Sequence, residues 1–182
     1  MIPKIIHYCW FGRGEKPELA KRCIASWRKF CPEFEIREWN EDNCDYLAVP
    51  FMAEAYAAKK YAFVTDVMRL LVLEQYGGVY FDTDVEVVRD ISPLLNDEGF
   101  IGFENDQFVN SGQVMAAVPH QSVVQAMIAA CRGHCEQVLS TLGATCESVS
   151  NELKRADAAV AQLPEAFTTL EGQLDELKKL EQ

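Results

Sequence analysis

Residues 62–88, AFVTDVMRLLVLEQYGGVYFDTDVEVV, decide the fold class of this chain of 182 residues. The first part is apolar around most of a helical circumference, which predicts a buried helix that ends at the Gly77–Gly78 pair. The next part alternates apolar and acidic residues as a β-strand does, which groups Asp82, Asp84 and Glu86 on one face. Neighbouring carboxylates repel one another, so this face predicts either a bound cation or contact with water.

Strand-like and helical segments alternate over the rest of the first 130 residues. Apolar or alternating runs predict strands at Lys4–Trp10, Phe34–Trp39, Gly99–Glu104 and Val109–Ala117. Apolar residues at helical spacing predict helices at Pro17–Phe30, after Pro50, and at about Ala62–Tyr76. This alternation predicts an α/β domain over residues 1–133.

The composition changes at about Val138, where aromatic residues become rare and Ala, Leu, Glu and Gln dominate. Apolar residues recur there every seven positions in two series, Leu139, Cys146, Leu153, Val160, Phe167, Leu174 and Leu142, Val149, Ala156, Leu163, Leu170, Leu177. This pattern predicts a helical tail over residues 138–182 that forms a coiled coil, and with it a homo-oligomer. Because Pro164 interrupts a continuous helix, a helical hairpin and packing of the tail on its own domain are equally compatible with the pattern.

The net charge of −11 argues against a general affinity for nucleic acid or for an anionic membrane. No apolar run has the length of about 20 residues that a transmembrane helix requires. The first residues, MIPKIIHYCWFG, do not resemble a secretory signal, and seven irregularly spaced cysteines suit a reducing compartment. We therefore expect a cytoplasmic protein of bacterial type, with the inner face of the membrane as a site of peripheral attachment.

Asp66 and Arg69 lie three positions apart on the predicted apolar helix and therefore share a face. A buried charge without a partner is costly, so these side chains must pair with each other or with a polar ligand. A structural ion pair and a ligand-binding pair are both compatible with the spacing.

Asp82-Thr83-Asp84 follows the glycine pair and a short apolar run. Mg²⁺ and Mn²⁺ prefer oxygen ligands, and a pair of carboxylates leaves coordination positions open for phosphate oxygens. We expect the chain to bend around such a metal, which breaks the strand alternation and leaves Glu86 as an exposed acid outside the ligand set.

Three segments of the chain together resemble the sugar-binding domain of glycosyltransferase family 32. They are IPKIIHYCWFG (residues 2–12), AAKKYAFVTDVMRLLVLEQYGGVYFDTDVEV (57–87) and FENDQFVNSGQVMAA (103–117). The family includes bacterial capsular-polysaccharide transferases and yeast α-mannosyltransferases, and it is more distantly similar to the clostridial glucosylating toxins. The resemblance covers about residues 1–130.

The resemblance implies a GT-A-like, Rossmann-like fold with a mixed central sheet. It also implies an enzyme that moves a hexose from a UDP- or GDP-sugar to a saccharide acceptor, with retention of configuration, in the synthesis of a surface polysaccharide. The implied cofactor is Mn²⁺ or Mg²⁺.

The resemblance also assigns roles to the acidic and basic residues. Asp84 corresponds to the direct metal ligand, and Asp82 to the residue that contacts the ribose and the metal. Asp66 and Arg69 correspond to the D-x-x-R pair that holds the hydroxyls of the donor sugar. These four residues are the predicted catalytic set.

Three further residues are predicted to bind the donor. Trp10 corresponds to the aromatic residue that stacks on the nucleotide base, His7 lies beside it on the first strand, and Asn110 lies near the sugar or the acceptor. No nucleophile stands out in the sequence, which agrees with the front-face mechanism usually ascribed to the family.

Family members continue well beyond the region of Asn110, whereas here the heptad-like tail follows. A shortened transferase, a catalytically degenerate protein that binds the donor, and one half of an assembly are all compatible with this difference. VYFDTDVE also resembles the first motif of haloacid-dehalogenase-type phosphatases. That reading leaves the D-x-x-R pair unexplained and lacks the second acidic pair and the later lysine.

Overall fold

A computed structural model describes residues 1–131, 144–145 and 147–155 of the chain. The chain divides into two compact units, Met1–Gly133 and His134–Gln182. The described residues of the second unit are helical. The coiled coil predicted over residues 138–182, and the homo-oligomer that it implies, lie largely outside the described residues. No helix in the described ranges is both long and apolar enough to span a membrane.

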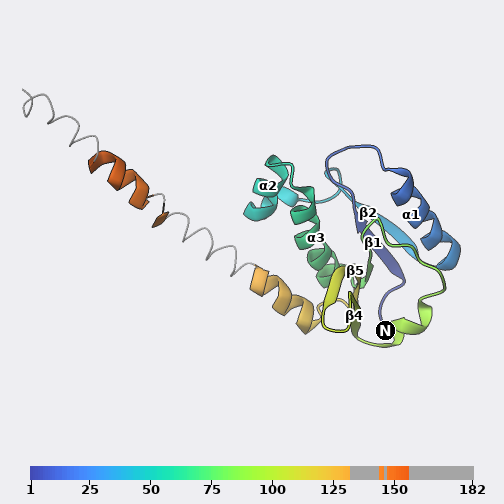
Figure 1. The fold of residues 1–182 in the computed structure, drawn as a ribbon. Coiled ribbons are helices and arrows are strands. Elements are labelled where there is room, and N and C mark those ends of the chain that lie inside the picture. Colours follow the sequence, from blue (N-terminus) through green and yellow to red (C-terminus); the bar gives the residue numbers. More distant parts are fainter. Residues whose placement is uncertain (132–143, 146, 156–182) are drawn as a thin grey trace, which may run out of the picture. The chain divides into compact units, whose positions relative to one another are not determined.

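The first unit is built on a five-stranded mixed sheet with helices on both faces (Figure 1). The strand order is β2-β1-β3-β5-β4, where β1 is Ile5–Cys9, β2 Glu35–Trp39, β3 Gly78–Tyr80, β4 Gly99–Phe103 and β5 Val109–Ala117. Strand β1 is parallel to β2 and β3, whereas β5 is antiparallel to β3 and β4. The predicted α/β fold class with a mixed central sheet is confirmed.

The helices lie close to their predicted positions, and two of them begin beside a proline. The α-helices are α1 (Glu18–Phe30), α2 (Pro50–Ala57) and α3 (Tyr61–Tyr76), with short 3₁₀ helices η1 (Tyr46–Ala48) and η2 (Ser92–Asn96). Residues 122–131 are also helical. Pro17 precedes α1 and Pro50 opens α2, where a missing N–H costs nothing because the first helical N–H groups have no partner within the helix.

Two apolar clusters cover the two faces of the sheet. One lies against α2 and α3 and includes Met68 and Tyr80, and the other lies against α1 and includes Trp27 and Phe81. Tyr80 and Phe81 enter different clusters because successive side chains of an extended chain point to opposite faces. The end of β3 is therefore fixed from both sides just before Asp82.

The turn between α3 and β3 requires both of its glycines. Gly77 and Gly78 have positive φ angles of 62° and 106°, and a Cβ on Gly78 would lie 2.6 Å from the carbonyl oxygen of Ile5. The fully buried His7 holds this turn, since its Nε2 donates to the Gly77 carbonyl (2.8 Å). Trp39 Nε1 donates to His7 Nδ1 (3.0 Å), which fixes the neutral tautomer.

The acidic stretch leaves the sheet earlier than strict alternation predicts. Strand β3 ends at Tyr80, and a turn follows in which the Val85 N–H donates to the Asp82 carbonyl (3.1 Å). Trp27 Nε1 then donates to the Val85 carbonyl (2.8 Å), which fastens the chain to α1. The expected break in the alternation is confirmed, because the chain turns at the D-x-D sequence.

Burial of His7 makes the stability of the fold dependent on pH. Burial lowers the pKa of His7 from 6.5 to about 4, so between these values the unfolded chain binds a proton that the folded chain does not. Stability therefore falls as pH decreases through this window, by about 3 kcal/mol in total from this group. Urea denaturation at a series of pH values measures this loss.

A His7→Gln variant, whose side chain does not titrate, is the control for this prediction. We expect its free energy of unfolding to change less than that of the wild type between pH 6.5 and about 5, where few carboxylates titrate. If the free energy of unfolding of the two proteins changed equally with pH in this range, the prediction would be contradicted.

Candidate active site

The buried guanidinium of Arg69 joins the two acidic motifs. Its side chain is only 7% exposed, and Nη2 lies 2.8 Å from Asp66 Oδ1 and 3.3 Å from Asp82 Oδ1. Nη1 donates to Ser111 Oγ (3.2 Å), and Nε donates to the Thr65 carbonyl (3.4 Å). The predicted pair of Asp66 and Arg69 is therefore formed, and it is one part of a network that also contains the first aspartate of D-x-D.

Asp82 is held in place from three directions. Besides its ion pair with Arg69, its Oδ1 accepts a hydrogen bond from the Tyr80 hydroxyl (3.0 Å), and its N–H donates to the Gly112 carbonyl (2.9 Å). Partial burial raises the pKa of Asp82, and the negative charges of Asp84 and Asp66 act in the same direction, against Arg69 and Tyr80. A cation bound at this carboxylate would relieve the repulsion among the acids.

Strand β5 bulges toward Asp82. Ile101 pairs with Met115, but the next residue of β4, Gly102, pairs with Asn110, so residues 111–114 have no counterpart on β4. Asn110 Oδ1 accepts the N–H groups of Gly112 (2.8 Å) and Gln113 (3.2 Å), which stabilises the bulge. The bulge thereby supplies two groups to the network, the Ser111 hydroxyl and the Gly112 carbonyl.

Gly112 allows this close approach because it has no side chain. A Cβ at this position would lie 2.2 Å from Asp82 Oδ2 and 3.0 Å from Arg69 Nη1. Neither Ser111 nor Gly112 was predicted from the sequence as a site residue. The sequence feature that could have indicated these two residues is Asn110-Ser111-Gly112. An asparagine side chain can stabilise a turn, and a glycine leaves room for a neighbouring side chain.

A cavity of about 460 Å³ opens beside this network. It is lined by Asp82, Asp84, Val85, Glu86, Glu104, Asn110, Gly112 and Gln113. Glu86 is exposed, as expected, yet it lines the same cavity as the D-x-D aspartates. Glu104 and Gln113 were not predicted, because only the β4–β5 hairpin and its bulge bring them here.

The lining of this cavity fits a hard divalent cation. Its polar groups are carboxylates and amides, which are the oxygen ligands that Mg²⁺ and Mn²⁺ prefer. Within the described part of the chain, no three His, Cys, Asp or Glu side chains are grouped so as to hold a metal ion. Asp82 and Asp84 would hold the ion together with ligands from outside the described residues, such as phosphate oxygens or water.

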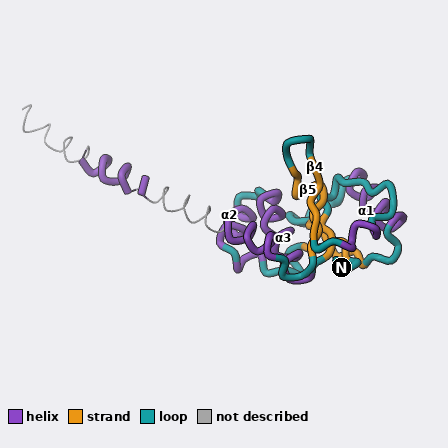
Figure 2. Tube along the Cα trace, turned by 90° about the horizontal axis from the view of Figure 1, so that it is seen from below, coloured by secondary structure: helices purple, strands orange, loops and turns teal. Residues whose placement is uncertain are grey.

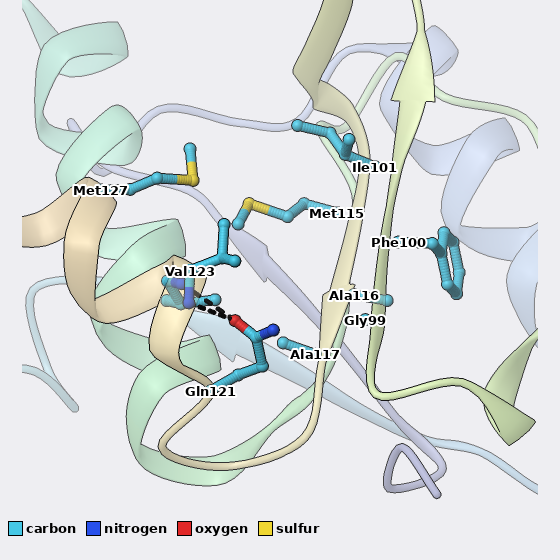
Figure 3. Close-up of a pocket in the computed structure, with 10 residues that line it drawn as sticks. Gly99, Phe100, Ile101, Met115, Ala116, Ala117, Gln121, Val123 and Met127 are labelled. Carbon is cyan, nitrogen blue, oxygen red and sulfur yellow. Dashed lines mark hydrogen bonds between the residues drawn. The ribbon is translucent and has the colours of Figure 1, made fainter.

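A second cavity, of about 210 Å³, has a different character (Figure 3). Apolar side chains of β4, β5 and residues 122–131 line most of it, and Met115, Val123 and Met127 face one another there while Phe100 points away. Its one amide residue, Gln121, accepts hydrogen bonds from the N–H groups of Val123 and Val124, which begins the helix. None of the predicted catalytic residues lines this cavity.

The central part of the chain matches a known family of sugar-transferring enzymes. Residues 17–101 match the family described as glycosyltransferase sugar-binding region containing DXD motif. This part of the chain is similar to glycosyltransferases of the family 32 type. The predicted resemblance is confirmed, and the phosphatase alternative is not supported.

Curated proteins similar to this part of the chain come from yeasts. Inositol phosphoceramide mannosyltransferase 3 of Schizosaccharomyces pombe is 28% identical over 128 residues, which cover 68% of this chain and 36% of the relative. The mannosyl phosphorylinositol ceramide synthase CSH1 of Saccharomyces cerevisiae is 27% identical over 126 residues, 65% of this chain and 32% of the relative. The chain spans about a third of the length of these relatives.

A solved structure shares the fold of this chain. The PaToxG glycosyltransferase superposes with a TM-score of 0.56 at 21% identity, over 68% of this chain and 57% of that chain. Together with the mixed sheet, this similarity confirms the GT-A-like fold class.

Two residues predicted to bind the donor do not line the acidic cavity. Trp10 follows β1 and is half-buried, its Nε1 donates to the Gly14 carbonyl (2.7 Å), and Lys16 Nζ lies 5.7 Å from its ring centre. His7 is inaccessible to a ligand because it is fully buried and both of its ring nitrogens are hydrogen-bonded within the fold. Direct donor binding by His7 is therefore corrected to a structural role in the turn before β3.

Asn110 does line the cavity, but its carbonyl oxygen is already engaged. Oδ1 accepts two backbone N–H groups of the bulge, so this residue positions Ser111 and Gly112 beside Arg69 and Asp82. Contact of Asn110 with the sugar or the acceptor stays a prediction and would involve its amide nitrogen.

Replacement of Gly112 by alanine tests the close packing of the bulge against the ion network. We expect Gly112→Ala to displace Asp82 and Arg69 and to weaken metal-dependent nucleotide binding more than about tenfold, as loss of a positioning contact at a metal site does. Gly14→Ala is the matched control, because a Cβ on Gly14 meets nothing within 4 Å. Isothermal titration calorimetry measures the binding, and equal affinities for the two variants would contradict this role of Gly112.

Proposed function

We propose that this chain binds a nucleotide sugar together with Mn²⁺ or Mg²⁺ and transfers a hexose to a saccharide acceptor with retention of configuration. The observation that carries the proposal is the Arg69 network, which places the D-x-x-R and D-x-D motifs side by side next to an acidic cavity. A solely structural ion pair would not require the cluster of carboxylates that lines this cavity.

The D-x-D residues have different roles in this proposal. Asp84 is exposed in the cavity and is free to approach a cation, whereas Asp82 is fixed by Arg69 and Tyr80. A bound Mn²⁺ or Mg²⁺ neutralises the diphosphate and stabilises it as a leaving group. The rigid Asp82 holds one side of the site, and Asp84 completes it when the donor binds.

The D-x-x-R pair is suited to orient the donor sugar. Asp66 is 55% exposed while one of its oxygens is held by Arg69, so its carboxylate can accept hydrogen bonds from sugar hydroxyls in a fixed orientation. Arg69 itself is buried and acts mainly by holding Asp66 and Asp82 in fixed positions relative to each other. Binding in one orientation lowers the entropic part of the barrier to transfer.

Retention by a front-face mechanism agrees with the state of Asp82. Its Oδ1 is engaged by a guanidinium and a phenol hydroxyl, and these contacts hold the carboxylate in place within the network instead of leaving it free to attack the sugar. Its role is therefore electrostatic. The acceptor hydroxyl would then attack the anomeric carbon on the side from which the diphosphate leaves, and the departing phosphate oxygen would take the hydroxyl proton.

The names of the yeast relatives suggest the sugar. Both relatives are named for mannose transfer, which favours a mannose donor, and both names include a phosphoinositol ceramide. For this chain we propose a hydroxyl of a saccharide as the acceptor, in the synthesis of a surface polysaccharide. A catalytically degenerate protein that binds the donor without transfer is the alternative, and measurements of binding and turnover separate the two.

Calorimetry with UDP- and GDP-hexoses, with and without Mn²⁺, tests the proposed function. We expect binding that depends on Mn²⁺ and that weakens more than about tenfold in Asp84→Asn, because the variant loses a charged ligand of the metal. Asp97→Asn is the matched control, since Asp97 is an exposed acid that does not line the cavity.

Turnover is measured in the same samples as release of nucleoside diphosphate. Slow hydrolysis of the bound donor supports the transferase, whereas binding without hydrolysis or transfer supports the degenerate alternative. Absence of metal-dependent binding across the donors would overturn both.

A further inference from the structure

The loop that joins β4 and β5 stands out from the first unit (Figure 2). Exposed aromatic side chains lie at the end of β4 and in this loop. Phe103 is 73% exposed and Phe108 is 63% exposed. We propose that Phe108 is a stacking platform for the pyranose ring of the acceptor, at the rim of the acidic cavity. The inference rests on the proposed function and extends it to the acceptor subsite.

The pairing of the hairpin places Phe108 on the same side as the cavity. Phe103 pairs with Val109, and the next pair is closed by a hydrogen bond from the Glu104 N–H to the Phe108 carbonyl (2.8 Å). Paired residues of an antiparallel ladder share a face, and so do residues two apart on one strand. Phe108 therefore shares a face with Glu104 and Asn110, and both of these line the cavity.

Phe103 lies on the opposite face of the same hairpin. Phe103 is the last residue of β4 and precedes Glu104, and its partner Val109 precedes Asn110 along β5, so both point to the face opposite that of Glu104 and Asn110. The hairpin thus offers two exposed phenylalanines, one beside the cavity and one turned away from it.

The backbone around Phe108 is already ordered. Asn105 Oδ1 accepts the N–H groups of Gln107 (2.9 Å) and Phe108 (3.1 Å). The Phe108 carbonyl in turn accepts from the N–H groups of Glu104 (2.8 Å) and Asn105 (3.3 Å). Since the peptide is held on both sides, a ligand would have little backbone entropy to remove, which favours binding.

A pyranoside matches the chemistry of this rim. The ring of a hexose has faces of C–H groups and edges of hydroxyls, so it needs an apolar surface next to hydrogen-bonding groups. Phe108 supplies the apolar face, and Glu104 and Gln113 supply a carboxylate and an amide for the hydroxyls. An anionic membrane surface fits less well, because the same segment carries the exposed acids Glu104 and Asp106 and the chain has a net charge of −11.

Saturation-transfer NMR tests the platform with three probes, the methyl α-glycosides of glucose, galactose and mannose, added to the full chain with diamagnetic Mg²⁺ and GDP or UDP. We expect at least one glycoside to receive saturation at its ring C–H protons. In Phe108→Ala its dissociation constant should rise about fivefold to tenfold, the range expected for loss of one aromatic contact. Phe103→Ala is the matched control and should leave the constant unchanged, and Phe108→Tyr should restore most of the binding.

Each outcome decides the inference. Absence of saturation for all three glycosides on the wild type, or equal effects of Phe103→Ala and Phe108→Ala, overturns the platform. Loss of binding to neutral vesicles in both variants, with glycoside binding unchanged, would overturn it in favour of a membrane contact. Nucleotide binding is measured by calorimetry in the same samples, so failure of the proposed function is seen separately from failure of the platform.

Discussion

The site depends on one buried cation, the guanidinium of Arg69. A buried charge is tolerated only when it is paired and hydrogen-bonded, and the partners of Arg69 come from its own helix, from the turn after β3 and from the bulge of β5. The first two segments are neighbours in the sequence, and Ser111 of the bulge lies 42 residues after Arg69. The ion pairs and hydrogen bonds of Arg69 therefore stabilise the contact between these three segments. They also set the distance between the D-x-x-R and D-x-D motifs.

Two close approaches of the backbone make this junction possible. At Gly78, β3 passes so near β1 that a side chain would collide with the Ile5 carbonyl, and at Gly112 the bulge of β5 passes equally near Asp82. The first contact directs the chain toward Asp82, and the second brings a carbonyl and a hydroxyl up to the acid and its arginine. Glycine is needed at both positions because there is no room for a Cβ atom. The Gly77–Gly78 turn also requires positive φ angles.

Local patterns were enough to predict the strands and the helices α1, α2 and α3 of the first unit, but not the helix at residues 122–131. The three-residue spacing of Asp66 and Arg69 requires a shared helical face, and the structure shows the ion pair. The positions of Glu104 and Gln113 depend instead on a register shift of β4 against β5, which alternation within one strand does not reveal. His7 was misassigned for a related reason, since both faces of β1 are buried and its sequence does not show which residues face a ligand.

The charge of the cavity links the fold to the proposed chemistry. Four carboxylates line it, those of Asp82, Asp84, Glu86 and Glu104, while the buried cation beside it, Arg69, is already shared between Asp66 and Asp82. A diphosphate approaching this surface alone would be repelled, because the protein charge that could attract it is already compensated. A divalent cation would offset two of these negative charges and would offer open coordination positions to phosphate oxygens, so the acids that repel a bare diphosphate would hold the ion that binds it. On these grounds the proposed requirement for a metal follows from the placement of Arg69, which holds the site together and leaves the neutralisation of the donor to the ion.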